Sequence, residues 1–177
     1  MKTDKFNYDL PEHLIAQYPS PKRTDSKLLV AIESIQHDSF KDIGNHINKG
    51  DLLILNKTSV VPARLYGEKS TGGKIEVLLE RFLSNNQTLT QIRSSRAPKE
   101  GSELVFSLEG KRFLATVQGR KENFFILDWS HDPKYLFEQY GQIPLPPYMN
   151  RAVEKLDEER YETIYADPNK KESVAAP

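Results

Sequence analysis

The sequence predicts a mixed fold: an incomplete α/β domain into which a closed antiparallel β-barrel of about six strands is inserted. Strand-like and helix-like segments alternate up to residue 61. Short strand-like runs separated by turn residues then fill residues 62–130, and helical patterns return after them. Turn signals at about every eight to twelve residues are typical of small all-β units. A barrel inserted into another domain produces this order.

The first part of the chain contains the elements expected of an α/β layer. Asp9 and Glu12 have the spacing of a capped helix start. Two apolar runs, Lys27–Ile32 and Asp51–Asn56, predict short strands that are covered on both faces. The polar segment between them, which ends at Gly50, predicts one short helix.

Six strand-like runs follow Pro62 and predict the barrel. In the second run Ile75, Val77 and Leu79 alternate with polar residues, which predicts a strand with one buried face. The runs are ARLYGEK, KIEVLLERFL, TLTQIRS, ELVF, KRFLATVQG and NFFILDW.

The stretch GEKSTGGK, between the first two runs, superficially resembles a phosphate-binding loop. That loop requires Ser or Thr after its lysine at the start of a helix, whereas Ile75 follows Lys74 here and begins a strand. Gly72 and Gly73 therefore predict a hairpin turn.

The segment GQIPLPPYMNR, residues 141–151, is called the proline arm below. It follows a predicted helix that Pro133 opens and Gly141 closes. Its prolines predict a stiff, extended segment that presents Tyr148 and Arg151 at set positions. A rigid connector and a polyproline-type ligand for an aromatic groove are both compatible with this pattern. The carboxylates of the following EKLDEERYETIYA predict the solvated face of a surface helix.

These patterns divide the chain into three parts: residues 1–61 begin the α/β domain, residues 62–150 form the barrel with its helix and proline arm, and residues 151–177 return to the α/β domain.

The composition of the chain excludes several kinds of chemistry. The 177 residues include no cysteine, which excludes disulfides, thiolate metal sites and a cysteine nucleophile. The four histidines lie far apart in the sequence, so we expect no metal site.

The chain carries 25 basic and 25 acidic residues, so any nucleic-acid contact must use a local patch. The start of the chain has no signal-peptide pattern, and no apolar run approaches about eighteen residues, so we expect a cytoplasmic protein.

Two segments contain candidate binding residues. Arg93, Arg96 and Lys99 follow one another closely in QIRSSRAPKEG, where guanidinium groups suit phosphate or carboxylate. Ordinary solvated charge at the rim of a barrel is the alternative. Arg64 ends the stretch NKTSVVPAR, which follows a predicted buried strand, the place where α/β ligand sites tend to lie. A linker between domains explains that stretch equally well.

Seven segments, taken in order, resemble one family, the S-adenosylmethionine:tRNA ribosyltransferase-isomerases of queuosine biosynthesis. The segments are LPEHLIAQYP, GDLLILNKTSVVPARLYG, GGKIEVLLER, IRSSRAPKEG, GQIPLPPYMNR, ERYETIYA and SVAAP. The resemblance implies an α/β domain with an inserted closed barrel and a reactive cleft where the two meet. It also implies transfer of the ribosyl part of S-adenosylmethionine to an aminomethyl-deazaguanine base of tRNA. Isomerisation then gives epoxyqueuosine and releases adenine and methionine.

S-adenosylmethionine is a consumed substrate in this implied reaction, and neither a metal nor another cofactor is implied. The implied partners are tRNA and S-adenosylmethionine, with no membrane, and we expect the full-length form to be a monomer. A base beside the sulfonium group could start the rearrangement, and Glu76 beside Lys74 is the catalytic candidate. Tyr148 is the candidate for stacking on a tRNA base, and Arg151 for anchoring the proline arm. The candidates for binding the methionine carboxylate or tRNA phosphates are Arg64, Arg93, Arg96 and Lys99.

The sequence departs from the family pattern at a few positions, where the pattern usually has Lys for Arg96, Asp for Asn150, Gln for Glu162 and Gly for Glu172. Family members are also much longer than this chain. We therefore expect the chain alone to be inactive, the barrel to be its best-folded part, and its uncovered strands to be open to self-association. A non-catalytic RNA-binding barrel is the alternative function.

Overall fold

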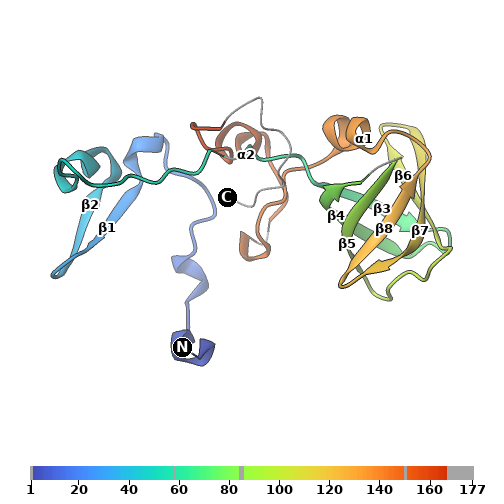
Figure 1. Cartoon of the computed structure of the whole chain (residues 1–177), viewed down its shortest axis with the longest axis horizontal. Helices are drawn as coiled ribbons and strands as arrows, with labels where there is room; N and C mark the ends of the chain where they lie inside the picture. The colour runs from blue at the N-terminus through green and yellow to red at the C-terminus, as the bar shows by residue number, and fades with distance from the viewer. Residues whose placement is uncertain (1, 58, 84–85, 150, 167–177) are drawn as a thin grey trace. The chain divides into compact units, whose positions relative to one another are not determined.

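The computed structural model describes residues 2–57, 59–83, 86–149 and 151–166. Thr58, Asn150, Glu172 and the SVAAP segment lie outside these ranges. The chain forms two compact units, one of Met1–Ile54 with Pro146–Arg151 and one of Leu55–Leu145 with Ala152–Pro177. Figure 1 labels the strands and helices of both. No helix in the described ranges is long and apolar enough to cross a membrane.

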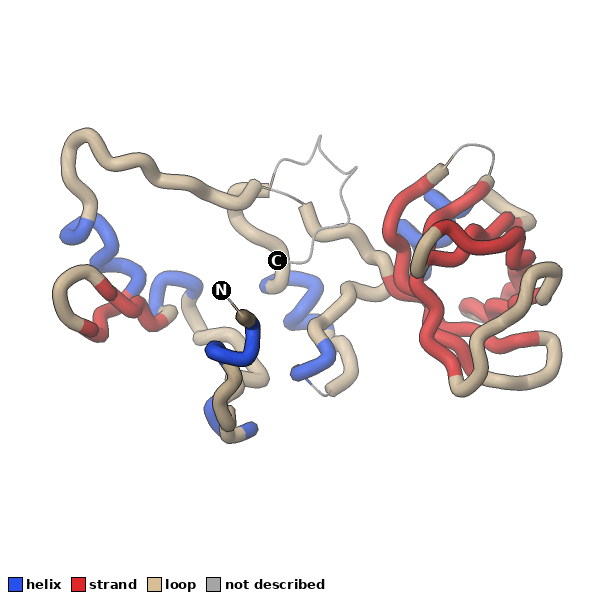
Figure 2. Tube along the Cα trace, turned by 60° about the horizontal axis from the view of Figure 1, so that its bottom comes forward, coloured by secondary structure: helices blue, strands red, loops and turns tan. Residues whose placement is uncertain are grey.

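The second unit contains a closed antiparallel barrel, which confirms the predicted fold class. Its strands follow one another around the ring in the order β3-β4-β5-β8-β7-β6, and Figure 2 shows the ring. β6 returns to β3 through the pairs Glu68↔Val105 and Lys69↔Leu104. The strands are β3 (Arg64–Lys69), β4 (Lys74–Phe82), β5 (Gln87–Ser94), β6 (Glu103–Leu108), β7 (Lys111–Lys121) and β8 (Phe124–Trp129).

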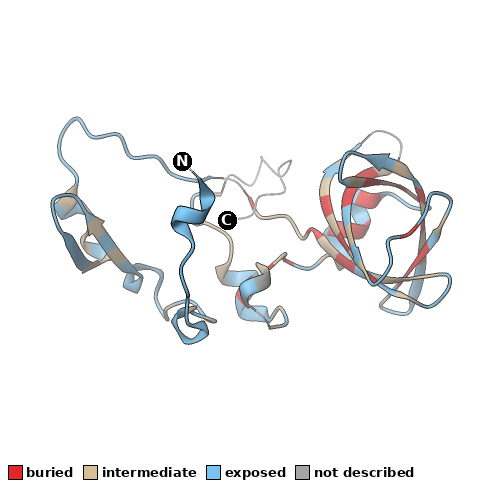
Figure 3. Cartoon of the chain, turned by 90° about the horizontal axis from the view of Figure 1, so that it is seen from below, coloured by how far each residue is buried: buried red, intermediate tan, exposed pale blue. Residues whose placement is uncertain are grey.

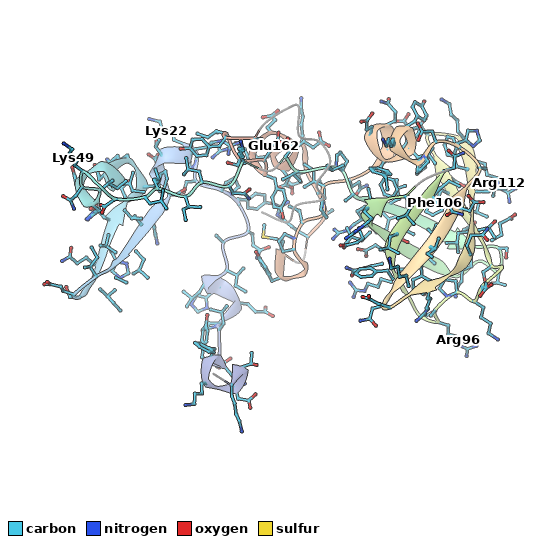
Figure 4. The ribbon with its side chains drawn as sticks, viewed as in Figure 1. Lys22, Lys49, Arg96, Phe106, Arg112 and Glu162 are labelled. Atoms are coloured by element: carbon cyan, nitrogen blue, oxygen red, sulfur yellow. The ribbon has the colours of Figure 1, made fainter. Side chains whose placement is uncertain are left out.

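Alternating side chains build the barrel core, as the sequence predicts. Ile75, Val77 and Leu79 of β4 are buried, while the residues between them are partly exposed. Phe106 is fully buried, and Figure 4 labels it within the barrel. A Cβ at Gly67 would lie 2.6 Å from the carbonyl oxygen of Val105 and 2.8 Å from the Phe106 ring, so glycine is required where β3 meets β6.

The helix α1 (Pro133–Tyr140) covers one end of the barrel. The Asp132 carboxylate accepts a hydrogen bond from the Lys134 N–H at 3.0 Å, and Gly141 ends the helix, as predicted. Phe137 is fully buried and packs edge-on against Phe82 and Trp129, with ring centroids 6.1 and 5.7 Å apart. Figure 3 shows that buried positions gather in the barrel and this helix.

The first unit has a two-stranded antiparallel sheet of β1 (Lys27–Ala31) and β2 (Ile35–Ser39). The predicted helix before Gly50 is a 3₁₀ helix, Phe40–His46. The backbone N–H of Phe40 donates to the carbonyl oxygen of Ser26 at 2.8 Å, which ties this helix to the start of the sheet. The other 3₁₀ helices of this unit are Thr3–Phe6, Glu12–Leu14, Arg23–Asp25 and Pro147–Met149.

Three predictions for local structure in the first part of the chain, residues 1–61, are wrong. Asp51–Asn56 forms no strand, because no described strand pairs with this run. Its Leu52 and Ile54 are 84% and 82% exposed. The strand Lys27–Ala31 forms, but it is not covered on both faces, since Leu29 is 59% exposed. The helix expected from Asp9 shrinks to the short turn Glu12–Leu14, where no residue is buried and an amphipathic helix therefore gains little.

The helix α2 (Lys155–Arg160) belongs to the second unit and is shorter than the predicted surface helix. Asp157 is buried and accepts a hydrogen bond from the Glu154 N–H at 2.8 Å, in a capping box. This carboxylate is therefore a helix cap, which corrects the prediction that it lies on a solvated face.

Candidate functional site

Four of the predicted site residues lie on the outer face of β3, β4 and β5. Glu76 pairs in the sheet register with Tyr66 on one side and with Arg93 on the other. Lys74 is two residues before Glu76 on β4, and Arg64 is two residues before Tyr66 on β3. Because side chains two apart in a strand share a face, the register brings these residues onto one patch.

Arg64 and Glu76 form an ion pair on this patch. The Arg64 Nε lies 2.9 Å from the Glu76 Oε1, and the two side chains are 14% and 25% exposed. The Nε–H has no hydrogen-bond acceptor among the described residues, so the contact is electrostatic and not an aligned hydrogen bond. The Arg64 Nη2 donates to the carbonyl oxygen of Leu145 at 3.1 Å. The guanidinium therefore joins the barrel to the first part of the proline arm.

The first part of the proline arm also pairs with the start of β3 through its backbone. The Arg64 N–H donates to the Gln142 carbonyl oxygen at 3.1 Å, and the Gln142 N–H donates back at 2.8 Å. Ile143 and Leu145 are buried. At Gly141 a Cβ would lie 2.5 Å from the Pro62 carbonyl oxygen, so the chain leaving the barrel runs directly against the chain entering it. The arm is thus held in place at this end.

Of the two described ion pairs on the patch, that of Glu76 is the shorter, at 2.9 Å against 3.7 Å between Lys74 and Glu68. Part of the Glu76 side chain is exposed, so it can accept a proton from a reactant bound on this face. Lys74 does not contact it. The Lys74 Nζ lies 3.7 Å from the Glu68 Oε2 on β3, and its side chain is 90% exposed. The two catalytic candidates share a face but make separate ion pairs.

Arg93, Arg96 and Lys99 are exposed on β5 and on the loop that follows it. The loop backbone is held at Arg96, whose carbonyl oxygen accepts hydrogen bonds from the Ser94 hydroxyl at 2.9 Å and the Lys69 ammonium at 3.0 Å. Figure 4 labels Arg96 at the end of the barrel away from α1. Arg96 and Lys99 therefore lie at the rim, beyond the patch, whereas Arg93 lies where the patch reaches the rim, opposite Glu76.

Tyr148 and Arg151 belong to the other unit. Tyr148 is 61% exposed. The Arg151 Nε donates to the carbonyl oxygen of Gln17 at 2.9 Å, and its guanidinium carbon lies 4.5 Å from the centroid of the Tyr18 ring. Arg151 thus joins the end of the proline arm to the N-terminal segment. The predicted site residues fall into two groups, one in each unit.

Two features near the site were not predicted from the sequence, the position of Tyr66 and the contact made by Glu162. Tyr66 is 48% exposed and lies opposite Glu76, and the alternation in ARLYGEK was a signal that could have placed it there. The Glu162 carboxylate accepts a hydrogen bond from the Val60 N–H at 3.1 Å, across 102 residues of sequence. No local sequence pattern predicts a contact between residues so far apart. Among the described residues, no group of three or more His, Asp or Glu gathers that could hold a metal ion.

Comparison with known proteins decides the family. The sequence matches a family model described as queuosine biosynthesis protein over residues 3–177. The chain belongs to this family. The resemblance found in the sequence is thereby confirmed, and similar members of the family include the S-adenosylmethionine:tRNA ribosyltransferase-isomerases of Acinetobacter baylyi and Acinetobacter baumannii.

The two relatives are 46% and 43% identical to this chain over 179 aligned residues. The alignments cover all of this chain but only 52% and 51% of the relatives, so the chain spans about half their length. A crystal structure of an S-adenosylmethionine tRNA ribosyltransferase from Thermotoga maritima is 30% identical, with a TM-score of 0.40. That comparison covers 94% of this chain and 55% of the other.

Proposed function

We propose that this chain supplies about half of an S-adenosylmethionine:tRNA ribosyltransferase-isomerase of queuosine biosynthesis. The family match over residues 3–177, together with 46% identity along the whole chain, supports the proposal. The proposed reaction transfers the ribosyl part of S-adenosylmethionine to the amine of an aminomethyl-deazaguanine base in tRNA. The ribosyl group rearranges to an epoxycyclopentane, and adenine and methionine leave.

Glu76 is the proposed base. The positive sulfur of S-adenosylmethionine acidifies the carbon beside it, so a carboxylate placed there can remove a proton and start the rearrangement. Arg64 then acts by positioning Glu76, because its guanidinium contacts both that carboxylate and the Leu145 carbonyl oxygen. Lys74 is the second catalytic candidate, since its exposed ammonium lies on the same face.

Substrate binding is proposed to involve both units. Arg93, Arg96 and Lys99 would bind anionic groups of the substrates, and Tyr148 would stack on an unpaired tRNA base. The contacts of Arg151 with Gln17 and Tyr18 support its role in anchoring the proline arm. We also propose that residues 62–150 form an inserted domain within a larger α/β domain.

A chimera tests the function. Residues 1–177 replace the matching half of the Acinetobacter baylyi relative, and transfer of label from ribosyl-labelled S-adenosylmethionine to tRNA carrying the modified base is measured. We expect the chimera to transfer label and the 177-residue chain alone to transfer none. In the chimera, Glu76→Gln should abolish transfer, whereas Glu109→Gln, an exposed carboxylate at a distant turn, should not. A folded chimera that binds tRNA but transfers no label would contradict the proposal.

One alternative function is a non-catalytic RNA-binding barrel. Two observations support it: the barrel closes within this chain, and it exposes cations at its rim. Titration separates the two functions. Binding of tRNA with a marked salt dependence, and no binding of S-adenosylmethionine by the chimera, would favour the alternative.

A further inference from the structure

Three connections meet at the end of the barrel that lies opposite α1. Ile75↔Ser94 is the last pair of β4 with β5, Lys69↔Leu104 the last pair of β3 with β6, and Lys121↔Phe124 the last pair of β7 with β8. Strand ends that pair in this way lie at the same end of a closed barrel. We call this end, made of residues 68–74, 93–103 and 119–123, the basic rim.

The basic rim has a net positive charge that the neutral total charge of the chain does not reveal. Its three segments contain seven Lys or Arg and four Glu, a net charge of +3, whereas the whole chain is neutral. The described segments at the opposite end, residues 80–83, 86–87, 108–114 and 128–131, contain three Lys or Arg and three Asp or Glu, which balance. Positive charge is therefore concentrated at one end of the barrel.

Most of these cations are not neutralised within the protein. The side chains of Arg93, Arg96, Lys99 and Lys121 make no hydrogen bond or ion pair with any other residue in the described ranges. Within the basic rim, Lys74 is the described cation that has a carboxylate partner. Arginine forks and ammonium groups in this condition are available to an external anion.

The backbone that carries Arg96 and Lys99 is already ordered. Besides the two hydrogen bonds that Arg96 accepts through its carbonyl oxygen, the Lys99 N–H donates to the Ser102 hydroxyl at 3.1 Å. Pro98 between them is buried. Binding an anion would therefore order side chains but not the loop itself, which lowers the entropic cost of binding. Lys69 contributes by fixing the loop and is a positioning residue.

We propose that the basic rim binds the phosphate backbone of RNA. Several free cations spread over two of the three rim segments, residues 93–103 and 119–123, match a chain of repeated negative charges better than one small anion. This inference rests on the proposed function for the identity of the RNA, which is tRNA. The free rim cations differ from Arg64, whose guanidinium is already occupied inside the protein by Glu76 and the Leu145 carbonyl oxygen.

The test compares two triple variants of the 177-residue chain that remove the same charge. The rim variant is Arg93→Gln, Arg96→Gln and Lys99→Gln. The control variant, at the other end of the barrel, is Arg81→Gln, Arg112→Gln and Lys134→Gln, which also removes two arginines and one lysine from exposed positions. Affinity for a fluorescent tRNA transcript is measured by anisotropy over a series of salt concentrations, and circular dichroism checks that each variant is folded.

Each phosphate contact contributes about 0.9 to the slope of log K against log salt, so losing three should reduce the slope by about 2 to 3. The rim variant should show this loss, and the control variant should keep the slope of the original chain. Equal losses in the two variants, or an unchanged slope in the rim variant, would overturn the inference. Weakened binding to phosphatidylserine vesicles with tRNA binding intact would assign the rim to membranes instead and would also overturn it.

The outcome is distinguishable from failure of the proposed function. Chimeras that carry the rim substitutions should transfer label only when tRNA is raised well above the concentration that the unsubstituted chimera needs. If the unsubstituted chimera transfers label and the rim variant binds tRNA normally, the function stands and the inference fails. If the unsubstituted chimera is inactive but the rim variant loses its salt slope, the inference stands and the enzyme proposal fails.

Discussion

Replacing Thr88 with valine should destabilise the barrel through one hydrogen bond. The Trp129 indole N–H donates to the Thr88 Oγ1 at 2.8 Å, and both residues are buried. Valine has nearly the shape of threonine but no acceptor, so the substitution leaves the indole N–H without a partner in the core. Thr90 is an internal control, because it is equally buried and its hydroxyl donates to the Phe125 carbonyl oxygen at the longer distance of 3.4 Å.

The expected losses of stability differ because the two substitutions leave different groups without a hydrogen-bond partner. An unpaired buried N–H costs about 1–3 kcal/mol, so Thr88→Val should lower the free energy of unfolding by roughly 2 kcal/mol. Thr90→Val removes a long and weak bond to an oxygen that keeps a second lone pair, and it should cost less than about 1 kcal/mol. The two variants should therefore be separated by about 1–2 kcal/mol.

Urea unfolding followed by fluorescence measures this difference, because Trp129 is the single tryptophan and reports on the barrel. With a slope of about 2 kcal/mol per molar urea, Thr88→Val should lower the midpoint by about 1 M. If Thr88→Val and Thr90→Val unfold at the same urea concentration, the assigned hydrogen bond does not stabilise the barrel and the reasoning is refuted.

Three further predictions concern the backbone and pH. Gly141→Ala should lower the unfolding free energy by about 1–3 kcal/mol in the same urea assay, because its Cβ would lie 2.5 Å from the Pro62 carbonyl oxygen. Gly44→Ala, which lies in the first unit with open space around it, should leave the midpoint reported by Trp129 unchanged. Glu122 has φ 55°, so Glu122→Asn should raise the melting temperature of the barrel by a few degrees, through about 0.5–1 kcal/mol of relieved strain, and an unchanged or lower value would count against it. Hydrogen bonds from His46 and from the Ser39 N–H hold the pKa of Asp38 below its ordinary value of 3.8. The ionised Asp38 carboxylate therefore stabilises the folded state. This contribution is fully present above pH 3.8 and is lost as the pH falls through the lower pKa that Asp38 has in the folded state. In His46→Ala, the midpoint of the Asp38 carboxyl chemical shift should therefore rise toward 3.8, and an unmoved midpoint would exclude the assigned cause.

Local sequence patterns were sufficient to predict those strands and helices whose own residues determine them. The alternation of Ile75, Val77 and Leu79 predicts a strand whether or not its neighbours are known, and Pro133 with Gly141 marks both ends of α1. The run Asp51–Asn56 has the same apolar character as a buried strand. A strand requires a hydrogen-bonded neighbour, however, and composition cannot show that no described segment supplies one.

The candidate site was predictable residue by residue but not as an arrangement. Arg64 and Glu76 could each be singled out by type and position, yet their ion pair depends on the register of β3 against β4. The hydrogen bond from Arg64 to Leu145 crosses 81 residues of sequence. The charge excess of the basic rim was equally hidden, because the total charge is zero and the order of turns around the barrel is known only from the fold.

The backbone bridge between Arg64 and Gln142 has a consequence for protein engineering. Because these residues are hydrogen-bonded neighbours, the polypeptide from 64 to 142 starts and finishes at nearly one point in space. A piece whose two ends meet in this way is suited to insertion into a surface loop of an unrelated host, because it does not force the ends of that loop apart. Circular permutants with a short linker joining these two ends and new termini at an exposed turn are equally accessible.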